Sequence, residues 1–175
     1  SVTRIGDRAF YSMDKLTKVE FAKGAKIERV GAYAFNHCTA LEKVVLPDSV
    51  KILENGVFSY CYQLSDVTLS KNLKELGDGV FSGSGIGSIE LPDSIEKMGS
   101  CVFRDCYFGT DDERSLTSVK MPANLKELGT CTFEGCAALT SVEFPEIIKL
   151  TTVQADTFFN CHALTYIYLP EAIAT

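Results

Sequence analysis

One pattern of apolar and polar positions recurs along the whole chain. A phenylalanine marks each copy, an aliphatic residue stands five positions before it, and a glycine usually follows that aliphatic residue. Cysteine stands three positions after the phenylalanine in most copies. The marking residues are Phe10, Phe35, Phe58, Phe81, Phe103, Phe133 and Phe158. Such self-similarity at a nearly fixed period indicates a repeat architecture in which each copy packs on its neighbours.

The second half of each copy has the form L-x-x-V-x-L, of which residues 41–46 are a clear example. Its alternation of apolar and polar residues predicts a short strand that buries every other side chain. The prolines of the chain directly follow this segment, where a residue without an N–H ends strand pairing; they are Pro47, Pro92, Pro122, Pro145 and Pro170. Two residues past that position, a serine or asparagine can hydrogen-bond the turning backbone, at Ser49, Asn72, Ser94 and Asn124.

Copies of this segment one repeat apart are expected to lie side by side as parallel strands, about 4.7–4.9 Å apart. The A-F-x-x-C-x-x-L stretch has apolar residues three and four positions apart, which predicts a short helical turn on the opposite side. We therefore expect an α/β repeat solenoid, a right-handed curved stack with one parallel sheet of seven short strands and short helical turns opposite.

We expect residues 1–175 to form a single domain of about seven repeats. Both ends cut a repeat at a similar phase and neither has a distinct cap. Because solenoids need polar terminal caps for solubility, we expect the chain to be an excerpt of a longer array.

The composition narrows the classes of function. The chain is 46% apolar and 23% charged, with a net charge of −6. A net negative surface does not neutralise phosphates, so nucleic acid is not an expected partner. The sequence contains no apolar stretch long enough to span a membrane and does not begin with a signal peptide. We expect no direct membrane insertion, and any targeting segment lies outside this chain.

Candidate chemistry centres on the cysteines, most of which occupy the repeat position after phenylalanine. A small, easily buried side chain fits that position, so we expect buried free thiols there, at Cys38, Cys61, Cys106, Cys136 and Cys161. No hydrolase, zinc-protease or C-x-x-C motif occurs, and the only histidines, His37 and His162, lie five repeats apart. We expect no enzyme activity, no cofactor and no metal site.

The outward rows of the predicted sheet vary between repeats while the inward rows stay apolar. The first outward row is Lys18, Lys43, Asp66, Ser88, Ser118, Ser141 and Tyr166. The second is Glu20, Val45, Thr68, Glu90, Lys120, Glu143 and Tyr168. A surface of this kind can display side chains for protein recognition, although the outward rows of any solenoid are free to drift. Tyr166 and Tyr168 are the best candidate anchors, because aromatic residues are enriched in binding hot spots.

Residues 30–41, which read V-G-A-Y-A-F-N-H-C-T-A-L, and residues 46–50, L-P-D-S-V, are similar to the BspA-type leucine-rich repeat family of bacterial and protozoan surface proteins. The resemblance implies an extracellular or cell-surface solenoid used in adhesion or protein recognition, and it supplies no catalytic residues. Two departures stand out: Ser84 replaces the cysteine in a repeat that is one residue short, and about seven residues are inserted after Cys106.

From these observations we expect a non-enzymatic repeat module, at the cell surface or secreted, that recognises another protein, such as a surface protein of a host or of a neighbouring cell. A purely structural spacer is the first alternative, and a glycan-binding module is the second. Glycan binding usually needs aromatic platforms in several turns, and we expect only the last turn to offer them.

Cys101 and Cys131 do not occupy the cysteine position after phenylalanine, because they stand two residues before Phe103 and Phe133. Stacking of consecutive turns should bring their Cα atoms to roughly 5–6 Å, a separation that a disulfide can span. The family resemblance implies an oxidising exterior, in which such a bond would persist. Neighbouring parallel segments hold side chains side by side, which suits disulfide geometry poorly, so a pair of exposed thiols is the alternative.

Overall fold

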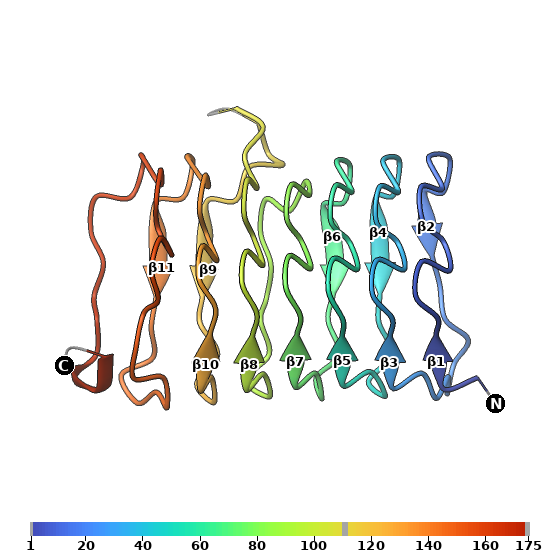
Figure 1. The fold of residues 1–175 in the computed structure, drawn as a ribbon, viewed down its shortest axis with the longest axis horizontal. Helices are drawn as coiled ribbons and strands as arrows, with labels where there is room; N and C mark the ends of the chain where they lie inside the picture. The colour runs from blue at the N-terminus through green and yellow to red at the C-terminus, as the bar shows by residue number, and fades with distance from the viewer. Residues whose placement is uncertain (1, 110–111, 174–175) are drawn as a thin grey trace.

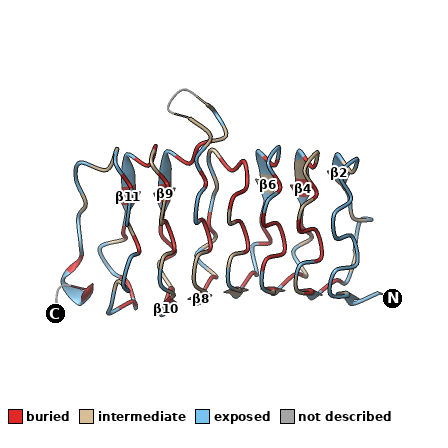
Figure 2. Ribbon diagram, turned by 45° about the horizontal axis from the view of Figure 1, so that its top comes forward, coloured by how far each residue is buried: buried red, intermediate tan, exposed pale blue. Residues whose placement is uncertain are grey.

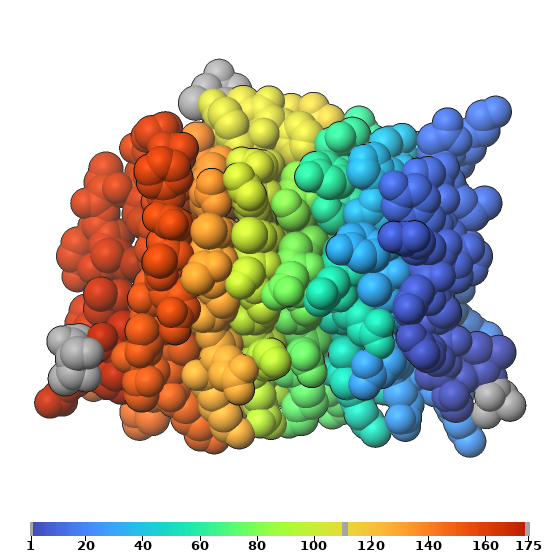
Figure 3. All heavy atoms as spheres, in the orientation of Figure 1, coloured from blue at the N-terminus to red at the C-terminus, as the bar shows by residue number. Residues whose placement is uncertain are grey.

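The computed structural model describes residues 2–109 and 112–173. The chain winds into a β-solenoid whose turns stack in sequence order, with the N-terminus at one end of the stack and the C-terminus at the other (Figure 1). In the space-filling view the turns form adjacent bands (Figure 3). All strand pairs within the described residues are parallel. The predicted solenoid with parallel strands is confirmed.

The longest sheet lies at the start of each repeat, where the sequence analysis predicted no strand. It has six parallel strands in the order β1-β3-β5-β7-β8-β10. Each strand is two residues long and ends on the aliphatic residue that precedes the phenylalanine by five positions. The strands are β1 (Arg4–Ile5), β3 (Arg29–Val30), β5 (Ile52–Leu53), β7 (Glu75–Leu76), β8 (Lys97–Met98) and β10 (Glu127–Leu128).

The L-x-x-V-x-L segments form strands in five repeats, but they do not form the single sheet of seven strands that was predicted. Three of them, β2 (Lys18–Val19), β4 (Lys43–Val45) and β6 (Asp66–Thr68), make one sheet. Two others, β9 (Ser118–Lys120) and β11 (Ser141–Glu143), make another. Residues 88–90 and 166–168 do not form strands. The predicted sheet is therefore interrupted between β6 and β9.

Two glycines that lie close to the neighbouring turns directly precede this interruption. A Cβ at Gly85 would lie 2.3 Å from the carbonyl oxygen of Tyr62 in the preceding turn. A Cβ at Gly87 would clash with the carbonyl oxygen of Glu113, which belongs to the insertion after Cys106. The main chain at Gly85 and Gly87 thus lies close to the main chain of both neighbouring turns. These glycines are followed by residues 88–90, which pair with neither β6 nor β9.

The predicted helical turns are wrong, and a ladder of tight turns takes their place. Around Phe35, the residues two before and two after it, Tyr33 and His37, have φ of 57° and 58°. The corresponding residues of the other repeats also have positive φ. An α-helix cannot continue through left-handed residues. The one helix among the described residues is a 3₁₀ turn at Glu171–Ile173.

Hydrogen bonds to the next repeat stabilise these turns. The N–H groups of Tyr33, Phe35 and His37 donate to carbonyl oxygens of the following repeat at 2.8, 3.0 and 2.9 Å. The N–H groups between them bond within the turn, as Ala34 does to Gly31 at 3.2 Å. Every other main-chain donor is thus paired between turns, which an isolated helical turn would not achieve.

The phenylalanines form one continuous stack through the interior. Consecutive ring centroids lie 5.0–5.7 Å apart with interplanar angles of 0–10°. Residues of the interior turns are mostly buried, whereas those of the terminal turns are much more exposed (Figure 2). Phe10 in the first turn keeps 39% of its surface exposed, and Phe81 in the middle of the stack keeps none.

The predicted row of buried free thiols lies beside this stack and is confirmed. Each Sγ donates to the carbonyl oxygen of the preceding repeat's phenylalanine, as Cys61 does to Phe35 at 3.1 Å. Burial raises the pKa of Cys106 to about 12. Ser84, which replaces a cysteine in this row, donates its hydroxyl to the Phe81 carbonyl at 2.6 Å instead.

We predict that Phe81→Ala lowers the free energy of unfolding by about 3–5 kcal/mol, because it removes a fully buried ring between two stacked neighbours. Phe10→Ala should cost less than about half as much, because the ring is already part-exposed and stacks on Phe35 alone. Urea unfolding followed by circular dichroism measures both. Equal losses would contradict a stack that is most stable in its interior.

Candidate functional site

The outward rows lie on the face formed by the second set of strands. Nine of the fourteen predicted residues stand on β2, β4, β6, β9 or β11, and the others, Glu20, Ser88, Glu90, Tyr166 and Tyr168, lie outside strands. All are exposed except Lys43, which is half-buried. Lys43 pairs in register with Asp66, and Ser118 with Ser141. The alternation therefore identified the outward positions correctly, while their role in binding stays a prediction.

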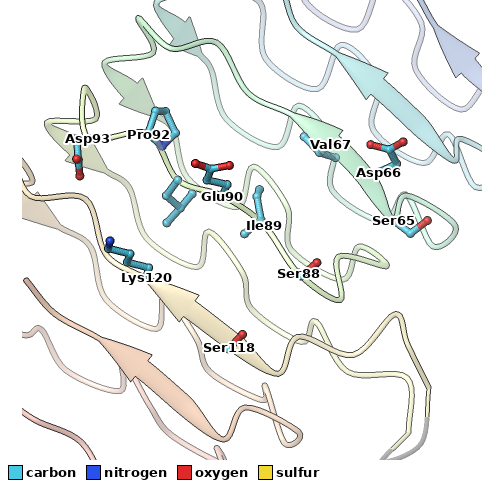
Figure 4. Close-up of a pocket in the computed structure, with 11 residues that line it drawn as sticks. Ser65, Asp66, Val67, Ser88, Ile89, Glu90, Pro92, Asp93, Ser118 and Lys120 are labelled. Atoms are coloured by element: carbon cyan, nitrogen blue, oxygen red, sulfur yellow. The ribbon is translucent and has the colours of Figure 1, made fainter.

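The interruption of the sheet leaves a hollow in the middle of this face. It has a volume of about 600 Å³ and lies between β6, the segment 88–93 and β9. Figure 4 shows Asp66, Ser88, Glu90, Ser118 and Lys120 around it, all of them predicted binding residues. The structure thus brings together five of the predicted residues at the place where strand pairing fails.

Incomplete closure also exposes part of the inward row. Val44 and Val119 are buried, whereas Val67 and Ile89, which line the hollow, are only half-buried. The hollow therefore combines apolar side chains with polar groups at its rim. This mixture is typical of sites that bind a ligand by burial and orient it by hydrogen bonds.

Acidic groups predominate around the hollow. Asp66, Glu90 and Asp93 contribute carboxylates, and Lys120 contributes the one ammonium group among the lining residues. Asp66 is partly neutralised by Lys43, whose Nζ lies 2.5 Å from Oδ2. Asp93 accepts a hydrogen bond from the main-chain N–H of Ala123 at 3.0 Å. The balance of charge favours a partner group that is cationic.

The described residues offer neither a metal cluster nor a membrane-spanning helix. Among residues 2–109 and 112–173, no three His, Cys, Asp or Glu side chains converge to hold an ion. No helix in that part of the chain is long and apolar enough to cross a bilayer. His37 instead lies beside Asn36, with Nδ1 and Oδ1 2.5 Å apart.

Cys101 and Cys131 occupy equivalent turn positions in consecutive repeats. Both are half-buried, have free thiols, and have φ of 58° and 57°. A hydrogen bond to Glu134, followed by desolvation, raises the pKa of the Cys131 thiol. The disulfide between them stays a prediction.

A stripe of aromatic side chains, not anticipated from the sequence, runs across the tight turns. Tyr11, His37 and Tyr60 follow one another with ring centroids 6.0 and 4.7 Å apart. Tyr62 and Phe108 continue the stripe at 6.3 and 6.2 Å. Only His37 and Tyr60 share a repeat position, so no single row of the repeat alignment reveals the whole stripe. The expectation that only the last turn offers aromatic platforms is wrong for this side of the molecule.

Comparison with known proteins identifies one family. Six copies of a family model described as a BspA type leucine rich repeat region match residues 1–109 and 111–175. A search of curated protein sequences finds no match.

Solved structures share the fold. A leucine-rich repeat protein from Bacteroides ovatus is 26% identical, with a TM-score of 0.78 over 93% of this chain and 42% of that chain. The leucine-rich repeat protein of T. pallidum is 29% identical, with a TM-score of 0.76 over 93% of this chain and 72% of that chain. The pneumococcal vaccine antigen PcpA, 23% identical, has a TM-score of 0.63 over 98% of this chain and 49% of that chain, which shows a common fold alone. The chain thus spans less than half of the B. ovatus structure.

We predict that Cys101 and Cys131 form a disulfide when the protein is exposed to air. The bond would close a loop that includes the insertion after Cys106 and add about 3 kcal/mol to the free energy of unfolding. Mass spectrometry of the native, non-reduced protein after alkylation tests this prediction. Cys61 and Cys106 serve as internal controls, since burial and a raised pKa should keep them unlabelled. An alkyl label on both Cys101 and Cys131 would show that no bond forms.

Proposed function

The chain belongs to the BspA-type leucine-rich repeat family, and from this premise we propose that it is a non-enzymatic recognition module, secreted or held at a cell surface, that binds another protein through its outward strand rows. Repeats of this family are typically non-catalytic. Leucine-rich repeats generally mediate protein binding through a continuous exposed face. The partner is a protein of a host or of a neighbouring cell.

The observation that carries this proposal is the hollow between β6 and β9. Five of the predicted binding residues line it, and half-buried Val67 and Ile89 give it an apolar part. A spacer needs only regular stacking, and regular stacking would have closed the sheet. An opening at the centre of a face whose outward residues vary between repeats therefore supports binding over a purely structural role.

Glycan binding is a second candidate, and the aromatic stripe favours it. Tyr11, Tyr60 and Tyr62 are all exposed and come from the first and third turns. Their rings could stack against sugar faces along the solenoid. This site lies on the tight turns rather than on the strand face, so the two candidate functions can be tested separately.

The hollow is tested by filling it. Fluorescently labelled protein is titrated onto cultured epithelial cells, and Ser118→Arg should weaken binding by about tenfold, because a long side chain obstructs the hollow. Ser141→Arg is the matched control, since Ser141 is the register partner of Ser118 in the same outward row but lies outside the hollow. Equal affinity of both variants and the parent would remove the hollow from the binding site.

The anchors of the last turn are tested in the same assay. Tyr166→Ala combined with Tyr168→Ala should weaken binding by at least about 1–2 kcal/mol, as expected for hot-spot truncations. Both rings are exposed, at 75% and 51%, so stability should change little. Tyr11→Ala with Tyr60→Ala is the control pair on the other side.

Treatment of the cells identifies the class of partner. Protease treatment should abolish binding, and periodate oxidation of glycans should leave it intact. Periodate sensitivity together with a loss in the Tyr11 and Tyr60 variant would establish glycan binding instead. A parent protein that binds no cell type would favour the spacer.

A further inference from the structure

The groups that line the hollow include unpaired main chain as well as side chains. Asp66 N–H donates to the Glu42 carbonyl at 3.1 Å, and the Thr68 carbonyl accepts from Leu46 N–H at 2.9 Å. Asp66 and Thr68 therefore direct their main-chain groups towards β4. Because successive residues of a strand face opposite sides, Val67 directs its N–H and C=O away from β4, into the hollow.

The opposite wall of the hollow has the same property. β9 pairs with β11 alone among the described strands, through bonds such as Met121 N–H to the Glu143 carbonyl at 2.8 Å. Its other edge faces β6 across the hollow. Within residues 2–109 and 112–173, the main-chain N–H groups of residues 88–91 have no protein acceptor. The segment between the two edges thus pairs with neither.

The hollow continues as a groove along β6. A smaller hollow of about 190 Å³ adjoins it, lined on one side by Val67, Thr68, Leu69 and Lys71 and on the other by Glu90 and Pro92. The groove therefore follows β6 from Ser65 to Lys71. At about 3.3 Å per residue, this is room for an extended segment of about six residues.

We propose that this groove binds an extended polypeptide segment, which adds to the free edge of β6 as an extra strand and places a lysine or arginine side chain against Glu90. This inference rests on the proposed function, in that it takes the strand face as the recognition surface. Strand addition to an exposed sheet edge is an established mode of peptide recognition.

The pattern of main-chain groups is what selects a polypeptide. Among the described residues, the N–H and the C=O of Val67 both lack a main-chain partner. An extended peptide has the matching pattern of donor and acceptor at every second residue. A glycan offers hydroxyl groups at other spacings and no such ladder. Half-buried Val67 and Ile89 add apolar contacts for the peptide's alternate side chains.

The experiment uses a blocked peptide that copies residues 116–121, L-T-S-V-K-M, one of the strand segments of this chain, which carries a lysine. Its binding to the whole chain is measured by fluorescence anisotropy, and amide exchange is followed by NMR. We expect saturable binding and slower exchange at the Val67 amide by at least about tenfold. No binding, or protection confined to the outer edges of β2 and β11, would overturn the proposal.

Two controls separate main-chain pairing from other contacts. A peptide methylated on alternate amide nitrogens keeps its side chains but loses N–H donors, so it should not bind. Glu90→Lys should weaken binding of the parent peptide by at least about fivefold, whereas Glu127→Lys, at an exposed position of β10 in the other sheet, should not. Equal binding of the methylated peptide would rule out strand addition, and an unchanged affinity for Glu90→Lys would rule out selection of a cation.

The outcome is distinguishable from a failure of the proposed function. If the peptide does not bind but cell binding persists and Ser118→Arg weakens it, the strand face recognises a folded surface and strand addition is wrong. If the peptide binds while the protein attaches to no cell, the groove is real and recognition of a surface protein is wrong.

Discussion

Stacking of identical turns is the constraint on which the rest of this structure depends. Each phenylalanine must meet the next at 5.0–5.7 Å with nearly parallel rings, so every repeat has to enter and leave the stack in the same register. The cysteine row follows from this stacking, because each thiol donates to the carbonyl oxygen of the phenylalanine in the preceding repeat, as Cys106 does to Phe81. Left-handed residues on both sides of the phenylalanine follow as well, since they let alternate N–H groups reach the next turn.

Sequence reasoning succeeded where repetition made a row visible. The buried phenylalanines and cysteines, the alternation of β4, β9 and β11, and the corners after the strands are all as predicted. At those corners Ser49 bonds to the Ala25 carbonyl at 2.9 Å, and Asn72 bonds to that of Asp48. Sequence reasoning failed where the spacing of apolar residues is compatible with two structures. Apolar residues three and four positions apart are compatible with a helical turn and also with a tight turn that contains left-handed residues. Residue types such as those of Arg8 and Tyr33 do not indicate a positive φ. Strands of two residues are too short to show an alternation.

The candidate site was predictable in its residues and not in its shape. Outward positions followed from alternation, because a strand with one buried face fixes which side chains face solvent. The hollow depends instead on a segment that fails to pair, which is a relation between three turns. Its traces in the sequence were the short repeat with Ser84, the glycines at 85 and 87, and the insertion after Cys106. Each is an ordinary local feature, and none of them by itself indicates that residues 88–90 lie unpaired between β6 and β9.

The repeat that contains Phe81 packs into the core like the others, although its residues 88–90 do not form a strand. Phe81 and Ile86 are fully buried, and β7 and β8 on the other side of the same turns remain paired. The interruption is therefore confined to residues 88–91, whose main-chain groups can bond to water at little net cost compared with a protein partner. A solenoid cannot open a cavity in its stacked interior without breaking the contacts between turns. It can open one at its surface by releasing a single edge, and this explains why the hollow lies where the repeat pattern departs most from its own rule.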